Sequence, residues 1–184
     1  AGTAPEEMLR VSCFVTSLEG VGAMRESISR MFPRAHLTIV QTQRVAERQV
    51  AECEGTARLR KAPAAQVVFL NPEGLPASKN YSQIALVSAP KLIFAGNQLA
   101  FRYGEEDARL AFQRLEKTMQ AAGSSLKHAV MLNTYPLSPQ LADLVRKVRF
   151  EFLDQARPPA ATMLPFEGLP SMDASFGLEA VAVA

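Results

Sequence analysis

The first sixty or so positions of the chain alternate between strand-like and helix-like spacing of apolar residues. β-branched and aromatic residues predict a strand over 8–16, and two further strands over 37–41 and 50–57. Between the first two strands, the recurrence of apolar side chains predicts a helix from about 21 to 31, which ends before Pro33. The apolar stripe of this helix, which we assign to core packing, consists of Met24, Ile28 and Phe32.

A stretch rich in proline and glycine, residues 60–79, separates this first part from the rest of the chain. A short apolar run over 67–70 predicts one strand embedded in it. Residues 80–97 then contain two apolar runs, 84–87 and 92–94, with Ser-Ala-Pro-Lys between them. This pattern predicts the two strands of one hairpin, with proline where a missing N–H does little harm. We expect the hairpin to open a compact α+β domain.

The remaining pattern is helix, strand, helix, strand, strand. The helix over 105–122 has acidic residues in its first turn, as the helix dipole favours, and Gly123 ends it. A strand over 128–135 follows, and Ser138 and Pro139 are suited to the N-cap and first position of the next helix. The chain closes with two expected strands, over 161–164 and 176–182.

The end of the chain repeats the pattern of its beginning. VMLNTYPLS, from Val130, aligns with VSCFVTSLE, from Val11; PPAATML aligns with RAHLTIV, and LEAVA with CEGTA. Only the second copy is preceded by the hairpin and the long helix. The sequence therefore predicts the back half of a first domain over 1–60, a linker over 61–77 and a complete domain over 78–184. Half a domain exposes an apolar sheet face and an unpaired edge, so we expect a longer natural chain or a partner subunit to cover it.

The composition is that of a globular protein, with 48% hydrophobic and 21% charged residues among 184 positions. The net charge is +2, and no run of Lys and Arg with interleaved aromatic residues marks a nucleic-acid-binding surface. No apolar run approaches the ~20 residues that span a bilayer, and no signal peptide is visible. The chain begins AGTAPEE, without methionine, so we expect a processed, trimmed or tagged amino terminus. Cytoplasmic localisation is the default expectation.

The two cysteines and two histidines do not predict a catalytic or metal site. We interpret Cys13 and Cys53, which lie in strand-like runs, as buried free thiols. His36 and His128 are flanked by apolar strand residues, which favours buried or edge positions over a role as general base. The four residues lack the spacing of a zinc site. Without a GxSxG motif or a glycine-rich loop before a helix, nucleophilic catalysis and phosphate binding gain no support.

Several motifs in the second part of the chain, taken in their order, resemble the Rid/YjgF family, which is also labelled endoribonuclease L-PSP. The resemblance covers roughly residues 78–184, and the first sixty residues resemble the back half of the family pattern more faintly. The motifs that carry it are NYSQIA, LIFAGN, AAGSSLKHAVMLNTY, PPAATML and LPSMDASFGLEAVA.

The resemblance implies a chorismate-mutase-like α+β fold, in which a mixed sheet carries two helices on one face. It also implies assembly into a trimer, or a pseudo-trimer of repeated domains, with ligand clefts between subunits. The best-known activity of the family is the hydrolysis of reactive enamines and imines, such as 2-aminoacrylate, to 2-keto acids and ammonia. This chemistry implies a small-molecule ligand and needs no metal or organic cofactor.

The chain departs from the family pattern where the substrate carboxylate would bind. The Rid deaminases carry an arginine in a PARS/T motif, and its guanidinium forms two parallel hydrogen bonds with the substrate carboxylate. That position is Ala161 here and Leu37 in the first copy. Arg157, four residues before Ala161, is the candidate replacement. A family asparagine on the second helix falls near Val145, which is also apolar.

Other residues of the family pattern are retained. The resemblance implies that Tyr81 lines the cleft and that Glu179 orients a water on the imine carbon. We count Pro90, in the predicted hairpin turn, among the residues that line this cleft. Each has a structural alternative, because Tyr81 could cap the hairpin and Glu179 could be a solvated strand residue. Glu54 is the equivalent of Glu179 in the first copy.

Three hypotheses for function follow. The first is a Rid-like protein with an interface cleft for a small molecule, with water addition to an enamine or imine as its chemistry. The second is a non-catalytic ligand-binding or scaffold module that kept the oligomeric fold and lost the chemistry. The third is the ribonuclease of the family label, which has least support because the chain shows neither a basic groove nor a cluster of base-stacking aromatic residues.

Overall fold

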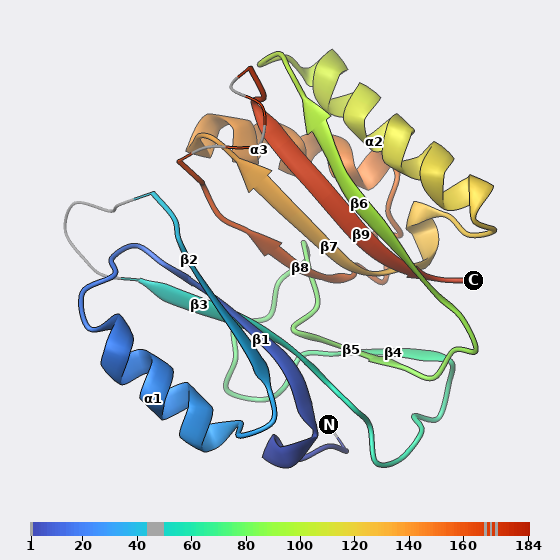
Figure 1. Ribbon diagram of the computed structural model, residues 1–184. Coiled ribbons are helices and arrows are strands. Elements are labelled where there is room, and N and C mark those ends of the chain that lie inside the picture. Colours follow the sequence, from blue (N-terminus) through green and yellow to red (C-terminus); the bar gives the residue numbers. More distant parts are fainter. Residues whose placement is uncertain (1, 44–49, 168, 170, 172) are drawn as a thin grey trace. The chain divides into compact units, whose positions relative to one another are not determined.

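The computed structural model describes residues 2–43, 50–167, 169, 171 and 173–184 (Figure 1). The chain divides into two compact units, Ala1–Ala62 and Pro63–Ala184. We describe each unit by itself and call them unit 1 and unit 2. Within the described residues, no helix is long and apolar enough to cross a membrane.

Unit 1 is a three-stranded sheet with one helix, in the strand order β2-β1-β3. The central strand β1 (Met8–Val15) pairs in parallel with β2 (His36–Gln41) and antiparallel with β3 (Ala51–Ala57). A short 3-10 turn, η1 (Pro5–Glu7), precedes β1, and the helix α1 (Val21–Met31) connects the parallel pair. These bounds agree closely with the sequence prediction. No residue of α1 is fully buried, so its apolar stripe packs only in part.

The two cysteines form a disulfide, so the prediction of free thiols is wrong. Cys13 on β1 lies directly opposite Cys53 on β3, with their Cα atoms 4.1 Å apart. Facing residues of an antiparallel pair bring their side chains onto one side of the sheet, which allows the two sulfur atoms to meet. Cys13 is fully buried, whereas Cys53 is exposed on the outer strand.

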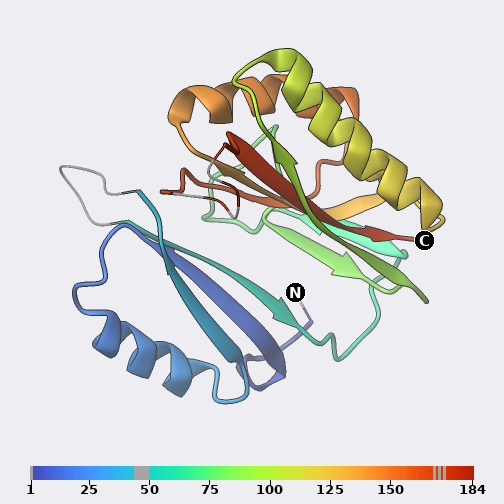
Figure 2. The same cartoon turned by 45° about the horizontal axis from the view of Figure 1, so that its top comes forward.

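Unit 2 contains a four-stranded sheet in the order β6-β9-β7-β8. Both long helices, α2 and α3, cover the same face of this sheet (Figure 2). The order along the chain is strand, helix, strand, helix, strand, strand. The bounds are β6 (Leu92–Ala100), α2 (Glu105–Ala121), β7 (Ala129–Pro136), α3 (Pro139–Val148), β8 (Ala160–Met163) and β9 (Phe176–Val183), with the 3-10 turns η2 (Leu126–His128) before β7 and η3 (Arg149–Glu151) after α3.

The predicted hairpin is wrong, although both of its strands exist. The first strand, β5 (Ile84–Val87), pairs antiparallel with β4 (Val67–Leu70) in a separate two-stranded sheet. The second strand, β6, pairs instead with β9 at the far end of the chain. The segment 88–91 therefore crosses from one sheet to the other. β4, which was predicted as a strand within the linker, belongs to unit 2.

The main core of unit 2 lies between the helices and the four-stranded sheet. It combines the inner faces of both helices with the residues of β6, β7 and β9 that point toward them. The rings of Phe112 and Phe152 stack within it, 5.3 Å apart. Each large apolar side chain that is fully buried stabilises the fold by about 1.5–3 kcal/mol. The largest of these are Phe112, Phe176, Leu115, Met119, Leu126, Leu132, Leu178, Val145 and Val148.

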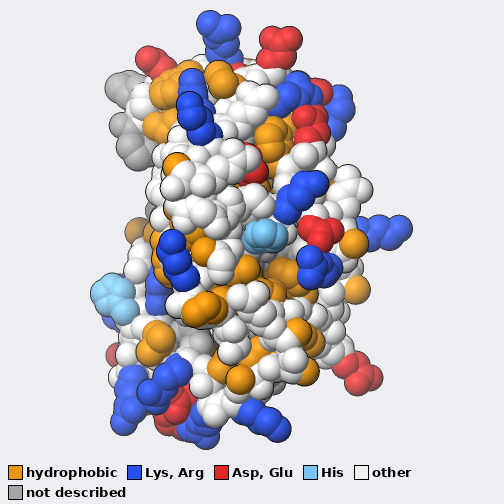
Figure 3. Space-filling model, turned by 90° about the vertical axis from the view of Figure 1, so that its right-hand side faces the viewer, with side chains coloured by type: hydrophobic (Ala, Val, Ile, Leu, Met, Phe, Trp, Pro, Cys, Tyr) orange, Lys and Arg blue, Asp and Glu red, His pale blue; other side chains and the backbone are white. Residues whose placement is uncertain are grey.

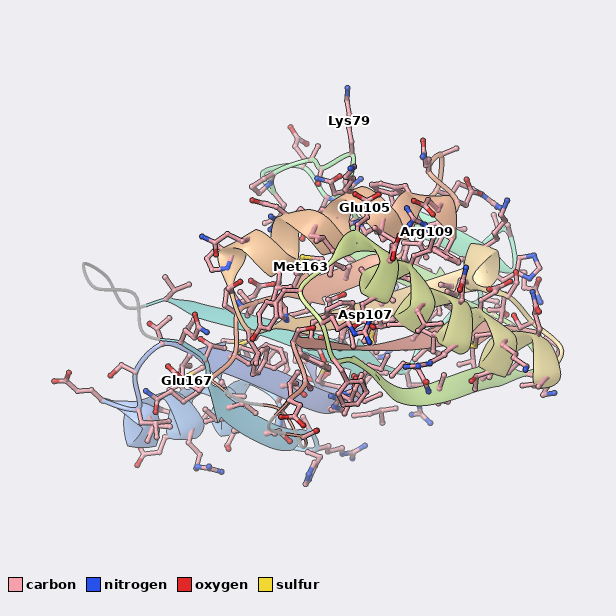
Figure 4. The ribbon with its side chains drawn as sticks, turned by 90° about the horizontal axis from the view of Figure 1, so that it is seen from above. Lys79, Glu105, Asp107, Arg109, Met163 and Glu167 are labelled. Carbon is pink, nitrogen blue, oxygen red and sulfur yellow. A yellow bond between two sulfur atoms is a disulfide. The ribbon has the colours of Figure 1, made fainter. Side chains whose placement is uncertain are left out.

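The helix ends follow the local chemistry of the sequence. Ser138 caps α3 by accepting a hydrogen bond from the amide of Leu141 at 3.2 Å. Gly123, at φ 88°, ends the α2 region in a conformation that disfavours other residues. At the other end of α2, Glu105 and Arg109 lie near α3 (Figure 4). The exposed ion pairs there join Arg109 to Glu105 and Glu151, and Lys147 to Glu105.

The two units share one strand arrangement. In unit 1, β1 is parallel to β2 and antiparallel to β3. In unit 2, β7 is parallel to β8 and antiparallel to β9. A helix connects the parallel pair in each case.

Candidate functional site

Three polar residues lie side by side across the sheet of unit 2. Asn133 on β7 is directly opposite Thr162 on β8 and Glu179 on β9. Residues that face one another across paired strands project to the same side of a sheet. Their chain neighbours Leu132 and Ala180 point into the core beneath the helices. The three polar side chains therefore project from the face that carries no helix.

Hydrogen bonds hold the Glu179 carboxylate in place on this face. The Tyr135 hydroxyl donates to Glu179 Oε1 at 2.6 Å, and Asn133 Nδ2 approaches the same oxygen at 3.4 Å. The rings of Tyr135 and Phe166 pack edge to face, with their centres 5.1 Å apart. This contact fixes the orientation of Tyr135, which is the hydrogen-bond donor. Glu179 itself is half-buried. A positioned carboxylate with access to solvent can orient a water molecule and accept its proton.

A β-bulge brings a further polar side chain to the same face. The register between β6 and β9 shifts between Ala95 and Gln98, so that Asn97 lies beside Gly177. A Cβ atom at Gly177 would come within 2.8 Å of Asn97 Nδ2 and even closer to its Oδ1. Glycine at this position therefore leaves the room that the Asn97 side chain occupies. Gly177 pairs with Tyr135, so both residues are close to the Glu179 cluster.

The next position along the strands is apolar. Met131 pairs with Ala160 and with Val181, two residues from each member of the polar row. None of these three side chains can form an ion pair. A substrate carboxylate held beside Glu179 would therefore find no arginine in register on these strands.

Ala161, the position matched to the family arginine, lies on the opposite face from Glu179. It pairs with Leu132, which is buried in the core with the helices. Successive strand residues point to opposite faces, so Ala160 and Thr162 are the β8 residues that share the face of Glu179. An arginine at 161 would consequently point toward the helix side.

The structure does not gather the other predicted site residues around Glu179. Val145 is fully buried in the core, where it has a packing role and no surface for a ligand. Pro90 is exposed in the segment between β5 and β6. Tyr81 is half-buried and precedes Ser82, which forms a bridge to Ala160 at the edge of β8.

Arg157 lies in the loop before β8 and is exposed. Its Nε atom donates to Asp154 Oδ2 at 3.0 Å. This hydrogen bond, followed by one from the Ala156 amide, lowers the pKa of the Asp154 carboxyl. Arg157 lines a cavity that none of Glu179, Tyr135 and Asn133 lines.

Unit 1 carries a similar row at the matching position. Ser12 on β1 lies directly opposite Thr38 on β2 and Glu54 on β3. In this match Glu54 corresponds to Glu179 and Thr38 to Thr162, as the sequence alignment predicted. Ser12 corresponds to Asn133, two residues beyond the position that the sequence alignment gave it. Arg10 donates to Ser12 Oγ at 3.0 Å and forms an ion pair with Glu54 at 3.4 Å. The two matching rows therefore differ in the neighbours of their glutamate, which are an arginine in unit 1 and a tyrosine and an asparagine in unit 2.

Sequence reasoning missed both hydrogen-bond partners of Glu179. Asn133 and Tyr135 were not singled out, although they are polar residues two apart in a buried strand. That spacing places both side chains on one face and could have indicated a polar site. Asn97 depends on the bulge, which no local pattern indicates.

A metal site gains no support in the part of the chain that the structure describes. No group of three or more His, Cys, Asp or Glu residues there could hold a metal ion. The face shown in Figure 3 carries hydrophobic side chains among scattered basic and acidic ones, without a continuous basic stripe. His36 and His128 are both exposed, so the expectation that they are buried or at an edge holds only for His36, on the outer strand β2.

Solved structures of similar fold come from several bacteria. The Rid-family protein YyfB of Yersinia pestis, a protein of unknown function, shares 18% identity over 65% of this chain and 100% of that chain, with a TM-score of 0.54. RidA of an Antarctic Psychrobacter shares 21% identity over 63% of this chain and 98% of that chain, with a TM-score of 0.47. A putative endoribonuclease of Thermotoga maritima shares 23% identity over 61% of this chain and 91% of that chain, with a TM-score of 0.46. At these identities the likeness to YyfB supports the fold alone.

The comparison with curated proteins finds no match to the chain. The sequence does match a family model. The model of the endoribonuclease L-PSP family matches residues 73–184, which is more than half of the chain and most of unit 2. The chain therefore belongs to the Rid/YjgF family, known also by that ribonuclease label.

Proposed function

We propose that unit 2 hydrolyses a small enamine or imine to a keto compound and ammonia, with Glu179 as the catalytic carboxylate. The observation that carries the proposal is the geometry of Glu179, which accepts a hydrogen bond from Tyr135 at 2.6 Å on the helix-free face of the sheet. A carboxylate held by its neighbours loses little conformational freedom when it engages a water molecule. Family membership supports the same reaction class.

The proposed reaction needs one base and one water molecule. An enamine first tautomerises to the imine, and water then adds through its oxygen to the imine carbon. Glu179 takes the proton that this water loses, and the electrons of the C=N bond move to the nitrogen. The carboxylic acid returns this proton to the nitrogen, which gives a carbinolamine. Glu179 then accepts the proton of the new hydroxyl group and passes it to the amino nitrogen, so that the C–N bond breaks, the C=O bond forms and ammonia leaves. General base catalysis of this kind contributes about 10²–10⁴-fold to the rate.

The substrate would differ from that of the family enzymes. Met131, Ala160 and Val181 flank the polar row, and none of them can pair with a carboxylate. Met131 and Val181 belong to a small apolar cluster with residues of β4 and β5. We infer that the substrate lacks the usual carboxylate. The same observation favours the alternative of a non-catalytic ligand-binding module.

A coupled assay separates the enzyme from the module. 2-Aminoacrylate and larger apolar imines are generated in situ, and the release of the keto compound is followed with the natural protein and with Glu179→Gln. We expect acceleration that falls at least about 100-fold in Glu179→Gln. Glu54→Gln is the matched control, because it removes the carboxylate at the same position of unit 1. No acceleration of any imine by the natural protein would leave the binding module as the better account.

We infer that unit 1 is the back half of a second Rid-like domain. The matching positions of Ser12, Thr38 and Glu54 on β1, β2 and β3 support this inference. The outer strand β3 has no neighbour on its far side in the described part of unit 1, whereas its counterpart β9 pairs with β6. The boundary of the units after Ala62 is close to the predicted start of the linker.

We also propose a homo-oligomer, a trimer or pseudo-trimer, that covers the exposed part of the helix-free face of unit 2, beside the residues of β4 and β5 that pack on it. Phe94 on β6 is 75% exposed and Leu92 is 41% exposed. Both face this side of the sheet, opposite Val181 and Val183. Exposed apolar residues on a sheet face are typical of protein interfaces. Sedimentation of the natural protein against Phe94→Glu tests the proposal, because the charge would dissociate an assembly built on this face.

A further inference from the structure

Unit 2 contains a cavity of about 670 Å³ that the Glu179 cluster does not line. It lies between the end of β4, the segment that precedes β5, and the segment that follows η3. Its volume falls in the range of about 300–1,000 Å³ that is usual for small-molecule sites. The lining residues that matter to its chemistry are Phe69, Asn80, Ser82, Phe150, Arg157 and Pro158.

Long-range hydrogen bonds hold the walls of this cavity together. Ser82 Oγ donates to the carbonyl oxygen of Pro158 at 2.7 Å, and the Ser82 amide donates to that of Pro159 at 3.0 Å. The guanidinium of Arg149 donates to the carbonyl oxygen of Asn80 at 2.7 Å. These bonds join segments about seventy residues apart in the chain, so the cavity is formed before any ligand binds.

A buried cation, Arg149, contacts two of the residues that line the cavity. Arg149 is 3% exposed, and within the described residues no carboxylate pairs with it and its Nε has no hydrogen-bond acceptor. Its guanidinium lies 4.8 Å from the centre of the Phe150 ring, and Phe150 and Asn80 both line the cavity. Burial, and then the charge of Arg146, lower the pKa of Arg149 to about 10, which leaves it charged near neutral pH. A buried charge without a counter-ion is expensive and favours an anion nearby.

The charged residues among those that line the cavity are both cations. Arg157 donates from its Nε to Asp154, and among the described residues no acceptor is seen for its two terminal nitrogens. Lys79 lines the cavity too, and Figure 4 shows its side chain extending outward from the loop. No Asp or Glu is among the lining residues that the structure describes. Phe69 and Phe150 provide apolar surface next to these charges.

We propose that this cavity binds a small organic anion with an apolar body, at a site separate from the Glu179 cluster. The anionic group lies against Arg157 and the loop that Arg149 holds. The apolar body lies against Phe69 and Phe150. The cavity combines these two kinds of surface, so an anion alone or an apolar molecule alone binds more weakly than a ligand with both.

Binding of three simple probes to the full chain tests the proposal. Benzoate carries both features, benzamide has the same shape without the charge, and acetate has the charge without the apolar body. Amide chemical shifts are followed during titration of each probe. We expect benzoate to bind at least about tenfold more tightly than either of the others, with shifts at Asn80, Ser82 and Phe150. The loss of a hydrogen bond to a charged group accounts for a change of at least about tenfold.

Variants then assign the binding to this cavity. Arg157→Gln keeps the exposed side chain polar and is expected to weaken benzoate binding about tenfold. Arg114→Gln is the control, because Arg114 is exposed on α2 and does not line the cavity. Glu179→Gln should leave benzoate binding unchanged, which separates this site from the proposed catalytic one. Far-ultraviolet circular dichroism confirms that each variant is folded.

Three results would overturn the proposal. The first is equal binding of benzamide and benzoate, which would mean that the cations do not act on a ligand. The second is benzoate binding that Arg157→Gln leaves unchanged. The third is a set of shifts confined to residues outside the cavity, which would place the anion elsewhere.

Discussion

Removal of the Cys13–Cys53 disulfide is expected to unfold or strongly destabilise unit 1 while leaving unit 2 intact. The bond closes a loop with a sequence separation of 40 residues. The chain-entropy relation gives a loss of about 13 cal/mol/K for a loop of this length, or about 4 kcal/mol near room temperature. Whole domains are commonly stable by only about 5–15 kcal/mol.

The rest of unit 1 offers little to replace this contribution. No residue of α1 is fully buried, and β3 is mostly exposed along its length. A short unit with a small core depends on cross-links more than a large one does. The four-stranded sheet and two helices of unit 2 contain no cysteine, so its stability should not respond to reduction.

Hydrogen exchange measured by mass spectrometry is the suitable assay. The chain has no tryptophan, and its three tyrosines all lie in unit 2, so intrinsic fluorescence would not report on unit 1. In the Cys13→Ala/Cys53→Ala variant, protection of the β1 and β3 amides should fall by up to about a thousandfold, since each 1.4 kcal/mol is about tenfold. The amides of α2 and β7 serve as the internal control.

Reductant provides a second control for the same prediction. It should reproduce the loss of protection in the natural protein and change nothing in the double alanine variant. Protection of β1 that stays within about tenfold of the natural value in the variant would refute the reasoning, because the loop closure would then contribute little to stability.

The remaining predictions concern unit 2. The hydrogen bonds from Lys147 and Arg109 lower the pKa of Glu105, and those from Arg109 lower that of Glu151. Stabilisation from these carboxyls is therefore present above the unfolded pKa, which is near 4.5, and is lost as the pH falls through the lower folded value. Thermal melting between pH about 7 and about 3 should show a smaller decline for Glu151→Gln than for the natural protein, and an equal decline would contradict this. Gly177→Ala should displace Asn97 and lower the proposed activity without unfolding the sheet, as side-chain shifts of Asn97 can show. Ser138→Ala should destabilise unit 2 by about 1 kcal/mol in urea denaturation, with Ser138→Asn as the rescuing control.

Features that depend on neighbouring residues were predicted well from the sequence. The helix α1 has the predicted bounds, and Ser138 caps α3 as expected. Both follow from apolar spacing and from the few residues at a helix end, which are local properties.

Features that depend on strand pairing were not predicted. β5 and β6 read as a hairpin because only four residues separate them, yet the partner of β6 lies at the end of the chain. The Cys13–Cys53 bond requires knowledge that β1 and β3 pair with these residues opposite each other. Pairing register arises from tertiary packing, and the local pattern of either strand does not contain it.

The candidate site falls between these two cases. Glu179 was identified through the family resemblance, and the structure gives it hydrogen-bond donors on the helix-free face. Ala161 was matched to the family arginine, but the parity of β8 turns it to the other face. A shift of one residue reverses the direction of a side chain, so the faint PAAT motif alone could not settle which residue faces Glu179.

The matching rows of the two units make their chemistry exchangeable. Asn133, Thr162 and Glu179 occupy the positions that Ser12, Thr38 and Glu54 occupy in unit 1. One substitution at Ser12 or Asn133 therefore transfers the central residue from one unit to the other without a change in strand register. The Arg10 neighbour of Glu54 corresponds to Met131, so Met131→Arg would place a guanidinium beside Glu179 from the strand next to it. The first sixty residues thus show one way to seat a cation beside this glutamate, an arrangement that the described residues of unit 2 do not show at Glu179.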